Sequence, residues 1–494
     1  TAMATPVKAL TIFTIGTCLT LNSCALAAGT DVLEEYLGKN AQLLGDLNVT
    51  KIHRAPDDVR PEDHHVALGE TYVRINAALQ ISSTRRGFGG WSSILTNKQG
   101  TALLAVSDVG VWLEADLTFN TTTDIVSNLA SVKMSPMRNI TADGSEEGIA
   151  GNKEWGDAET LTSETGGSLG DDDGGAVLVS FERRHRIWKY TKDVDGPVPH
   201  PVHPGVSAIF SQCKLNGGVE AAEVLRDGRL FAVCEHPEPG SPHEDHVPGW
   251  IFTNWEGSKG DFGVLPIWLP LDGSFFGMTD LARLPPHGEH EEHDHLLLLS
   301  RAHVEVCDDC VMHGSAMRLS RVHVPRIGMG GGVLKVELLT ELWASDGYPI
   351  DNMEGLTVIP GRPKPPGVDE SVLEEPYATA FVISDDNFNP AQRTLLLQIT
   401  LTSALEAPAY VSEMGRKTTL APSSIRTAPP SDGVVESSDS PKGQGRRQSR
   451  TAVFVLVGGG VLGIMVATAL LAADYVKEKF RRRELYVRLD EVDE

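Results

Sequence analysis

Aromatic and cationic side chains are scarce in this chain. Phe, Trp and Tyr form 6% of the 494 residues, while Gly (49) and Pro (29) together slightly exceed average usage. This balance favours a turn-rich β protein over a helical bundle. Lys and Arg number 43 against 67 Asp and Glu, which gives a formal net charge of −24. Such a surface repels nucleic acid, so we expect no nucleic-acid partner, and it suits a cationic cofactor.

Cysteine is also sparse. Two of the six cysteines belong to the leader segment described below, and the other four are candidates for disulfide bonding: Cys213, Cys234, Cys307 and Cys310. The last two form a CxxC pair, but no second CxxC is present to complete a four-thiolate zinc site. We therefore favour a local disulfide or free thiols at that pair over a metal.

Long apolar runs occur near the two ends. At the first, Lys8 precedes the run ALTIFTIGTCLTL, and Ala25 and Ala27 supply a small-x-small cleavage site. This layout predicts a signal peptide over residues 1–27, with a buried strand as the alternative. Residues 452–473 are uncharged and are followed by KEKFRRR. They would span about 33 Å as a helix, which predicts a transmembrane helix with a basic cytoplasmic flank rather than a buried soluble helix.

The order of the segments predicts a single-pass type I membrane protein of the cell surface or of an endosomal or vacuolar membrane. Residues 28–74 form a polar N-terminal segment, and residues 402–450 form a disordered stalk rich in Ser, Pro and Thr. The short cytoplasmic tail, residues 474–494, contains YVRL from Tyr486 to Leu489, which resembles a sorting signal that an adaptor would bind. The predicted glycosylation sites are Asn48, Asn120 and Asn139.

Residues 75–401 have the pattern of an all-β domain, because short apolar runs alternate with Gly, Pro and Asp turns and no helical period is sustained. Five internal repeats share a short opening strand, a turn, and an apolar strand that ends in a charged residue. Their spacing of roughly 50 to 80 residues suits β-propeller blades with loop insertions. We predict six blades, the sixth closing from the flanking segments; a β-sandwich is the alternative.

Several motifs in these repeats resemble one known family. In order they read FGGWSSI, LLAVSDVGVW, LVSFERRHRIW, NGGVEAAEVLRDGRLFAVCE, MTDLARLP, DNMEGLTV and ISDDNFNPAQRTLLLQITL. Together they resemble the domain family called esterase-like activity of phytase, or phytase-like, over about residues 75–401. The resemblance implies a β-propeller related in shape to calcium-dependent phytases and activity on phosphate esters. The sequence departs from the family pattern at Thr160, where Gly is usual, and at Val109, where Arg is common.

The propeller hypothesis gives the charged strand ends a common location. The innermost strands run along the central channel, so residues at equivalent strand ends converge on one mouth. We expect a ring of carboxylates interrupted by arginines, and the acids that end apolar strands and join this ring include Asp108, Glu182 and Glu235. The predicted metal ligands are Glu159, Glu220, Glu354, Asp385 and Asp386. The predicted phosphate-binding residues are Arg183, Arg186 and Arg301.

Two functions follow from this ring. An excess of hard oxygen ligands favours calcium, and calcium with arginine could hold a phosphorylated small-molecule substrate, which predicts a calcium-dependent phosphoric-ester hydrolase. The alternative is a non-catalytic propeller that acts as a binding module or receptor. In that case the acids accept backbone N–H bonds from neighbouring blades and have a structural role.

Overall fold

The computed structural model describes residues 36–37, 41–52, 66–68, 71–121, 123–140, 146–169, 175–237, 245–257, 261–271, 276–286, 294–304, 314–324, 331–361 and 377–403. All of them belong to the first of two compact units, Thr1–Leu420. The predicted signal peptide, transmembrane helix and tail lie outside the described residues, as do residues 404–450 of the predicted stalk, Cys307, Cys310, Tyr486 and Leu489. Within the described ranges, no helix is long and apolar enough to cross a membrane.

The described strands form five main sheets. In pairing order, the first contains β1 (Gln42–Leu43), β8 (Val126–Pro136), β7 (Val111–Phe119), β6 (Ala102–Ser107) and β5 (Trp91–Thr96). The second contains β11 (Ala158–Ser163), β12 (Val177–Phe181), β13 (Arg186–Thr191) and β14 (Val198–Pro201). The third contains β15 (Val219–Val224), β16 (Leu230–Cys234), β17 (His246–Thr253), β18 (Gly263–Pro270) and β22 (Gly332–Val333).

The fourth and fifth sheets complete the set. The fourth contains β19 (Gly277–Arg283), β20 (Asp294–Val304), β21 (Gly314–Val324) and β23 (Lys335–Trp343). The fifth contains β2 (Asn48–Lys51), β4 (Thr71–Ser82), β26 (Thr394–Ser403), β25 (Ala378–Asp385) and β24 (Asn352–Pro360), with β3 (Val66–Leu68) on β4. The connections hold β9 (Arg138–Ile140), β10 (Glu146–Gly148), α2 (Lys153–Gly156), α3 (Pro204–Phe210) and the 3₁₀ turn η2 (Ala344–Asp346).

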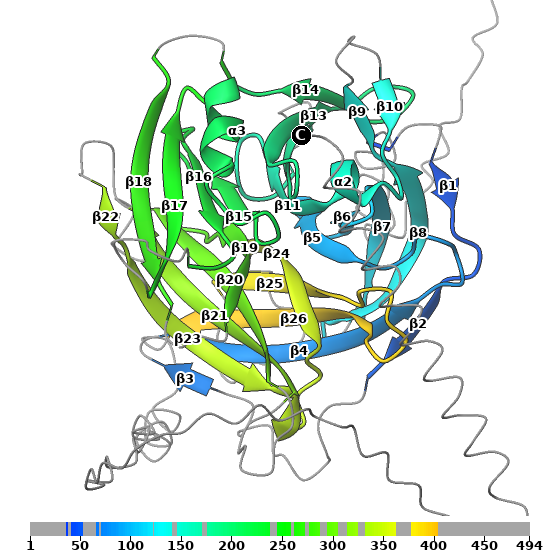
Figure 1. Cartoon of the computed structure of the whole chain (residues 1–494). Helices are drawn as coiled ribbons and strands as arrows, with labels where there is room; N and C mark the ends of the chain where they lie inside the picture. Colours follow the sequence, from blue (N-terminus) through cyan, green and yellow to red (C-terminus); the bar gives the residue numbers. More distant parts are fainter. Residues whose placement is uncertain are drawn as a thin grey trace, which may run out of the picture. The chain divides into compact units, whose positions relative to one another are not determined.

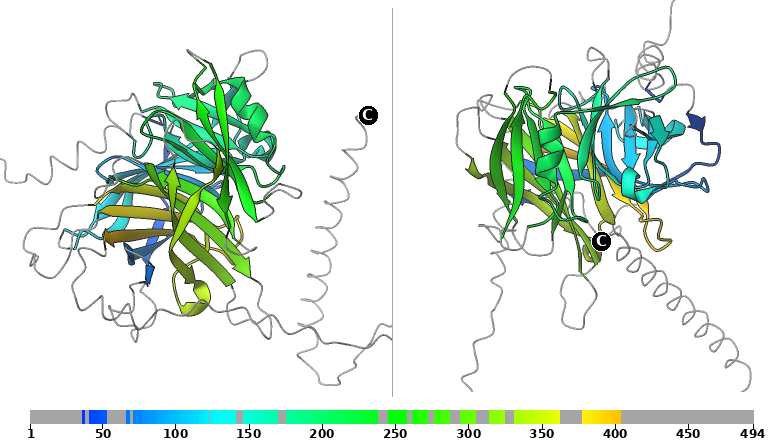
Figure 2. Two further views of the ribbon diagram at one scale, coloured as in Figure 1. Left: turned by 90° about the vertical axis from the view of Figure 1, so that its left-hand side faces the viewer. Right: turned by 45° about the horizontal axis from the view of Figure 1, so that its top comes forward.

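The five sheets are the blades of a closed propeller. Their first strands, β5, β11, β15, β19 and β24, lie near a common centre in Figure 1, and each contacts the next, with β24 returning to β5. Figure 2 shows the blades from two other directions. The all-β propeller prediction is confirmed, but the number of blades was wrong: there are five rather than six.

The sixth blade is absent because the flanking segment completes the fifth. Strand β4 pairs antiparallel with β26, from Thr394 opposite Ile81 to Ser403 opposite Thr71. The early and late parts of the domain therefore share one sheet. This pairing leaves no spare strands for a further blade among the described residues, because strands from both parts of the domain belong to the fifth sheet.

The core lies between the blades. The second strand of each blade is buried on both faces, which explains uninterrupted apolar runs such as ALLAVS in β6 and LFAVC in β16. Trp91, Trp112 and Phe381 are among the largest fully buried side chains. A disulfide joins Cys213, just after α3, to Cys234 at the end of β16, which confirms one of the candidate pairs. It fixes the segment that leads into the third blade.

A register irregularity recurs near the start of every innermost strand. Pairing with the second strand shifts between Trp91 and Ser93, Ala158 and Leu161, Val219 and Ala221, Met278 and Asp280, and Met353 and Gly355. A β-bulge redirects the side chain of the extra residue. The residues skipped at these shifts are Ser92, Glu159 with Thr160, Glu220, Thr279 and Glu354. Three of the five bulges therefore carry a glutamate.

Candidate functional site at the acidic mouth of the channel

Charged side chains collect at the end of the channel where the innermost strands begin. Each second strand runs antiparallel to the first, so its last residues lie beside that beginning. Here β6 is followed by Asp108, β12 by Glu182 and β16 by Glu235. Arg301 on β20 and Asp385 on β25 occupy the corresponding places opposite Gly277 and Asn352. We call the following eight acids the acidic mouth: Asp108, Asp157, Glu159, Glu182, Glu220, Glu235, Glu354 and Asp385.

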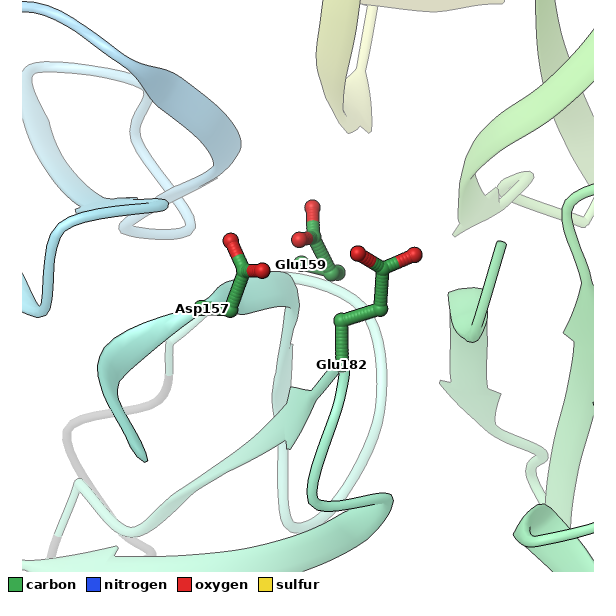
Figure 3. A group of neighbouring side chains, drawn as sticks. All are labelled: Asp157, Glu159 and Glu182. Atoms are coloured by element: carbon green, nitrogen blue, oxygen red, sulfur yellow. The ribbon is translucent and has the colours of Figure 1, made fainter. Parts of the chain in front are cut away.

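Three of these carboxylates are close enough to share one ion. Asp157 precedes β11, Glu159 is at its bulge, and Glu182 follows β12. One oxygen from each lies within 4.8 Å of the others. Figure 3 shows the three side chains directed toward one another from the second blade. Asp157 and Glu182 are buried, and Glu159 is partly exposed.

The acids of the mouth disfavour one another's ionised forms. Burial, followed by repulsion from Glu220, raises the pKa of Glu159 well above its usual range. Burial and then Glu235 do the same to the pKa of Glu220. Burial raises the pKa of Glu354 to about 8, although Arg301 opposes the shift. The pKa values of Glu182 and Asp385 rise to about 7, again chiefly through burial. Additional positive charge at the mouth would reverse these shifts.

Two of the predicted phosphate-binding arginines are engaged by acids of the mouth. Arg301 on the fourth blade bridges acids of the third and fifth blades, with Nη2 3.2 Å from Glu235 Oε1 and Nε 2.8 Å from Glu354 Oε1. Arg183 Nε is 2.6 Å from Asp157 Oδ2. Both predicted phosphate-binding residues are therefore near the acids, but each guanidinium is already paired with a carboxylate.

Arg186, the third predicted phosphate-binding residue, lies elsewhere in the second blade. Its guanidinium carbon is 3.8 Å from the centre of the Phe181 ring, and its N–H groups donate to the carbonyls of Arg184 and Trp155. Burial lowers its pKa to about 10. Cation–π packing and carbonyl contacts use this side chain in the blade structure.

The predicted metal ligands fall into two groups. Glu159, Glu220 and Glu354 are at equivalent bulges, and Glu220 interacts electrostatically with Glu354. Asp385 also acts on Glu354. Asp386 is at the rim, where its carboxylate accepts from Gly90 N–H (3.2 Å), Phe388 N–H (3.0 Å) and the Thr394 hydroxyl (3.1 Å). Its oxygens are occupied by that turn.

Two mouth residues were not predicted. Asp157 precedes Glu159 by two residues, a spacing that puts both on one side of an extended chain, so the sequence contained a signal for it. Lys153 lies on the short helix α2, with Nζ 2.7 Å from Asp108 Oδ2 and 3.5 Å from Asp157 Oδ1. Its side chain is 50% exposed. An ammonium has three N–H donors, so Lys153 can bind both acids and still donate a hydrogen bond to a ligand.

Deeper in the channel the acids are fully bonded. Asp280 is 0% exposed and accepts hydrogen bonds from the Ser93 hydroxyl (2.7 Å) and from Leu356 N–H (2.7 Å), Leu281 N–H (2.8 Å) and the Thr160 hydroxyl (3.4 Å). It links four blades. Thr160, where the family has Gly, thus contributes to this network. Asp280 therefore has the structural role that the alternative hypothesis assigned to the acids, in which they accept hydrogen bonds from neighbouring blades.

The mouth has the chemistry of a hard-cation site. Asp108 Oδ1 is buried without a hydrogen-bond partner. Within the described ranges, no hydrogen bond or ion pair reaches the carboxylates of Glu159 and Glu220. Buried polar groups are normally satisfied, so unsatisfied oxygens in a cluster fit calcium, which takes six to eight oxygen ligands. The residues present therefore fit calcium.

The predicted glycosylation sites differ in exposure. Asn48 and Asn120 are exposed, whereas Asn139 is 4% exposed. A side chain buried to that extent is a poor acceptor for a glycan in the folded chain.

Comparisons with known proteins place the chain in a family. No curated protein matches its sequence. Similar solved structures include the Cps50 (Swd1) β-propeller domain of Myceliophteria thermophila, at 10% identity and a TM-score of 0.28, covering 71% of this chain and 98% of that one. A Saccharomyces cerevisiae complex of Dbp5 with Nup159, Gle1, IP6 and ADP matches at 8% identity and 0.28, covering 74% and 96%. The WD40 domain of Toxoplasma gondii coronin matches at 11% and 0.25, covering 74% and 88%.

No conclusion about this chain is drawn from similarities with TM-scores this low. The family is identified by a comparison with family models. The family model described as phytase-like, esterase-like activity of phytase, matches residues 86–388, and the chain belongs to that family.

Proposed function

We propose that this protein is a calcium-dependent phosphoric-ester hydrolase whose site is the acidic mouth. The observation that carries the proposal is the set of Asp157, Glu159 and Glu182, whose oxygens lie within 4.8 Å of one another and include a Glu159 carboxylate without a partner among the described residues. Such a cluster is electrostatically unfavourable by itself. A divalent cation would offset the repulsion.

The residues of the mouth divide the work between them. Asp157, Glu159 and Glu182 would hold the ion. Calcium bound there would polarise a phosphoryl oxygen and make an attacking water more acidic. Lys153 would bind a phosphate oxygen through its remaining donor. Arg301 keeps the Glu235 and Glu354 carboxylates in place on the opposite side.

The second candidate function is cation or partner binding without hydrolysis. The observation that favours it is the engagement of all three predicted phosphate-binding arginines, Arg183, Arg186 and Arg301. Val109 also lacks the positive charge common in the family at that position. A mouth with eight acids and few available cations would repel bare phosphate.

The membrane anchor and the location belong to the proposal as well. The apolar run at residues 452–473 and its basic flank support a type I protein with the propeller outside the cell or in a lumen. Calcium is abundant outside cells, where calcium-binding modules with dissociation constants of about 10⁻⁴–10⁻³ M are sufficient. The YVRL segment supports recognition by a sorting adaptor.

One experiment separates the two functions. Calcium binding to the purified full-length protein is measured by calorimetry, and phosphate release from p-nitrophenyl phosphate is measured with calcium and with chelator. We expect both to be present in the parent protein, and both to fall at least tenfold in the double variant Glu159→Gln with Glu182→Gln.

The matched control is Glu154→Gln. That acid is on the same segment but pairs with Arg184 and has a side chain 58% exposed, so neither readout should change. Binding without phosphate release in the parent would favour the second function. Absence of calcium binding would reject the site.

A further inference from the structure

An exposed aromatic ring stands at the rim of the acidic mouth. Phe388 follows β25 and is 45% exposed. It and Asn387 have φ values of +50° and +48°, in the left-handed region that bulky residues rarely adopt. This conformation is sterically unfavourable for a residue that has a Cβ. The ring is therefore exposed although burial would favour an apolar side chain, and its backbone has a conformation that is unfavourable for a bulky residue.

Two acids fix the turn that presents the ring. Asn387 N–H donates to Asp385 Oδ1 at 2.6 Å, and Phe388 N–H donates to Asp386 Oδ1 at 3.0 Å. Both carboxylates are therefore bonded to the backbone that sets the position of Phe388. The position of the ring is thereby coupled to the fifth blade's part of the mouth.

The ring and the unsatisfied oxygen of the mouth lie close to the same residue, Gly90. A Cβ built on Gly90 would be 2.8 Å from Phe388 Cε2 and 2.1 Å from Asp108 Oδ1, so both atoms flank the same glycine. Gly90 has a φ of +64° and no side chain, and both features are required for this approach. An aromatic edge carries positive partial charge, so it is a favourable neighbour for a carboxylate oxygen.

A continuous line of groups joins the ring to the proposed ion site. Asp108 Oδ2 is 2.7 Å from Lys153 Nζ, and Lys153 Nζ is 3.5 Å from Asp157 Oδ1. Phe388 is thus next to Asp108, and Asp157 is one of the three proposed ligands. A phosphate bound at Lys153 would have its ester oxygen and alcohol group within reach of the ring.

We infer that Phe388 determines specificity by contacting the alcohol group of the substrate, and that the preferred substrates are phosphate monoesters of flat, apolar alcohols. The inference rests on the proposed function. One phosphate can be compensated by Lys153 and a bound cation. Each further phosphate would add negative charge to a mouth that already has an excess of it. The exposed ring instead favours an apolar group.

The test compares ligands that differ only in the apolar group. Binding of 1-naphthylmethylphosphonate and of methylphosphonate, which are not hydrolysed, is measured by calorimetry on the full-length protein in calcium. Aromatic pairing is worth about 0.5–1.5 kcal/mol beyond area burial, so we expect the naphthyl compound to bind about tenfold more tightly or better. In Phe388→Ala that preference should fall to about twofold or less, with methylphosphonate binding unchanged.

Two further variants control for the possibility that a substitution changes binding by disturbing the fold. Phe388→Asn removes the ring but suits the left-handed backbone, so it should reproduce the Ala result. Val194→Ala truncates another exposed apolar side chain, 68% exposed in the connection between β13 and β14, and should leave the preference intact. The KM for 1-naphthyl phosphate should rise in the two Phe388 variants while that for glycerol 2-phosphate stays constant.

The outcomes distinguish this inference from the proposed function. Hydrolysis of both esters with equal changes in KM would overturn the role of Phe388 and leave the hydrolase standing. Naphthyl preference lost in both Phe388 variants, with no hydrolysis of either ester, would support the ring contact and reject the hydrolase. Absence of any naphthyl preference in the parent protein would overturn the inference directly.

Discussion

Two sets of carboxylates lie along the same channel, and the chain surrounds them differently. In the interior, Asp280 accepts four hydrogen bonds and Glu223 accepts three, from the Thr162 hydroxyl (3.2 Å), Gly167 N–H (2.8 Å) and Arg283 N–H (3.2 Å). At the mouth, Glu159 has acidic neighbours and no hydrogen-bond donor among the described residues.

The difference separates structural acids from acids that await a ligand. Donors around Asp280 come from several blades, so its carboxylate oxygens tie the ring together through hydrogen bonds. The mouth acids weaken the fold when all are ionised, and the protein keeps them nonetheless. A group retained at a cost to stability is expected where it serves binding or catalysis.

The largest effect should follow from removing the interior acid. Asp280→Ala leaves the N–H groups of Leu356 and Leu281 and the Ser93 hydroxyl unsatisfied, and each such buried group costs about 1–3 kcal/mol. Three such groups together should lower the free energy of unfolding by about 4 kcal/mol in denaturant titration. Asp280→Asn, which keeps one acceptor oxygen, should cost less. A loss below about 1 kcal/mol in the Ala variant would contradict the structural role.

A smaller effect should appear in the pH dependence of the interior. Burial raises the pKa of Glu223 from 4.5 to about 7, so between these values the folded state holds more protons than the unfolded state. Its contribution is therefore lost as pH rises through that window, by about 3 kcal/mol. Unfolding free energies are compared at about pH 5 and about pH 8 in saturating calcium, which suppresses the contribution of the mouth.

Glu223→Gln should flatten that decline, because the amide does not titrate. The histidines are the same in both proteins, so their titration cancels in the comparison. An equal decline in parent and variant would show that Glu223 does not titrate in this range.

The sequence was sufficient to locate the second strands of the blades and most of the mouth, but not to count the blades. Apolar runs that end in a charged residue marked the second strands, and their repetition placed Asp108, Glu182, Glu235, Arg301 and Asp385 at one end of the channel. The blade count failed because nothing in residues 71–82 distinguishes a strand of a new blade from the outer strand of the last one; only its pairing with β26 does.

The sequence also did not predict which partners the charged side chains have. The arginines of FERRHR were equivalent in the sequence, yet Arg183 pairs with Asp157 whereas Arg186 packs on Phe181. Arg183 also has a left-handed φ of +55°, which no local pattern specifies. Lys153 was missed because it comes from a connection between blades rather than from a repeat.

The smallest stability effect should have the opposite sign to that of Asp280→Ala. Burial raises the pKa of Glu182 to about 7, so at a pH above that value its ionised form weakens the fold. Glu182→Gln keeps an acceptor for Gly218 N–H and removes the charge. A rise of the pKa from 4.5 to about 7 corresponds to about 3 kcal/mol, and the weaker hydrogen bond from Gly218 N–H to an amide oxygen offsets part of that gain. In chelator at about pH 8 we therefore expect the free energy of unfolding to rise by about 2 kcal/mol. Calcium should stabilise the parent, as a ligand specific to the folded state does, and should stabilise this variant far less. Thermal unfolding with and without calcium measures both differences. If the variant were less stable than the parent in chelator, Glu182 would belong with the structural acids, and the distinction between mouth and interior would not hold for this residue.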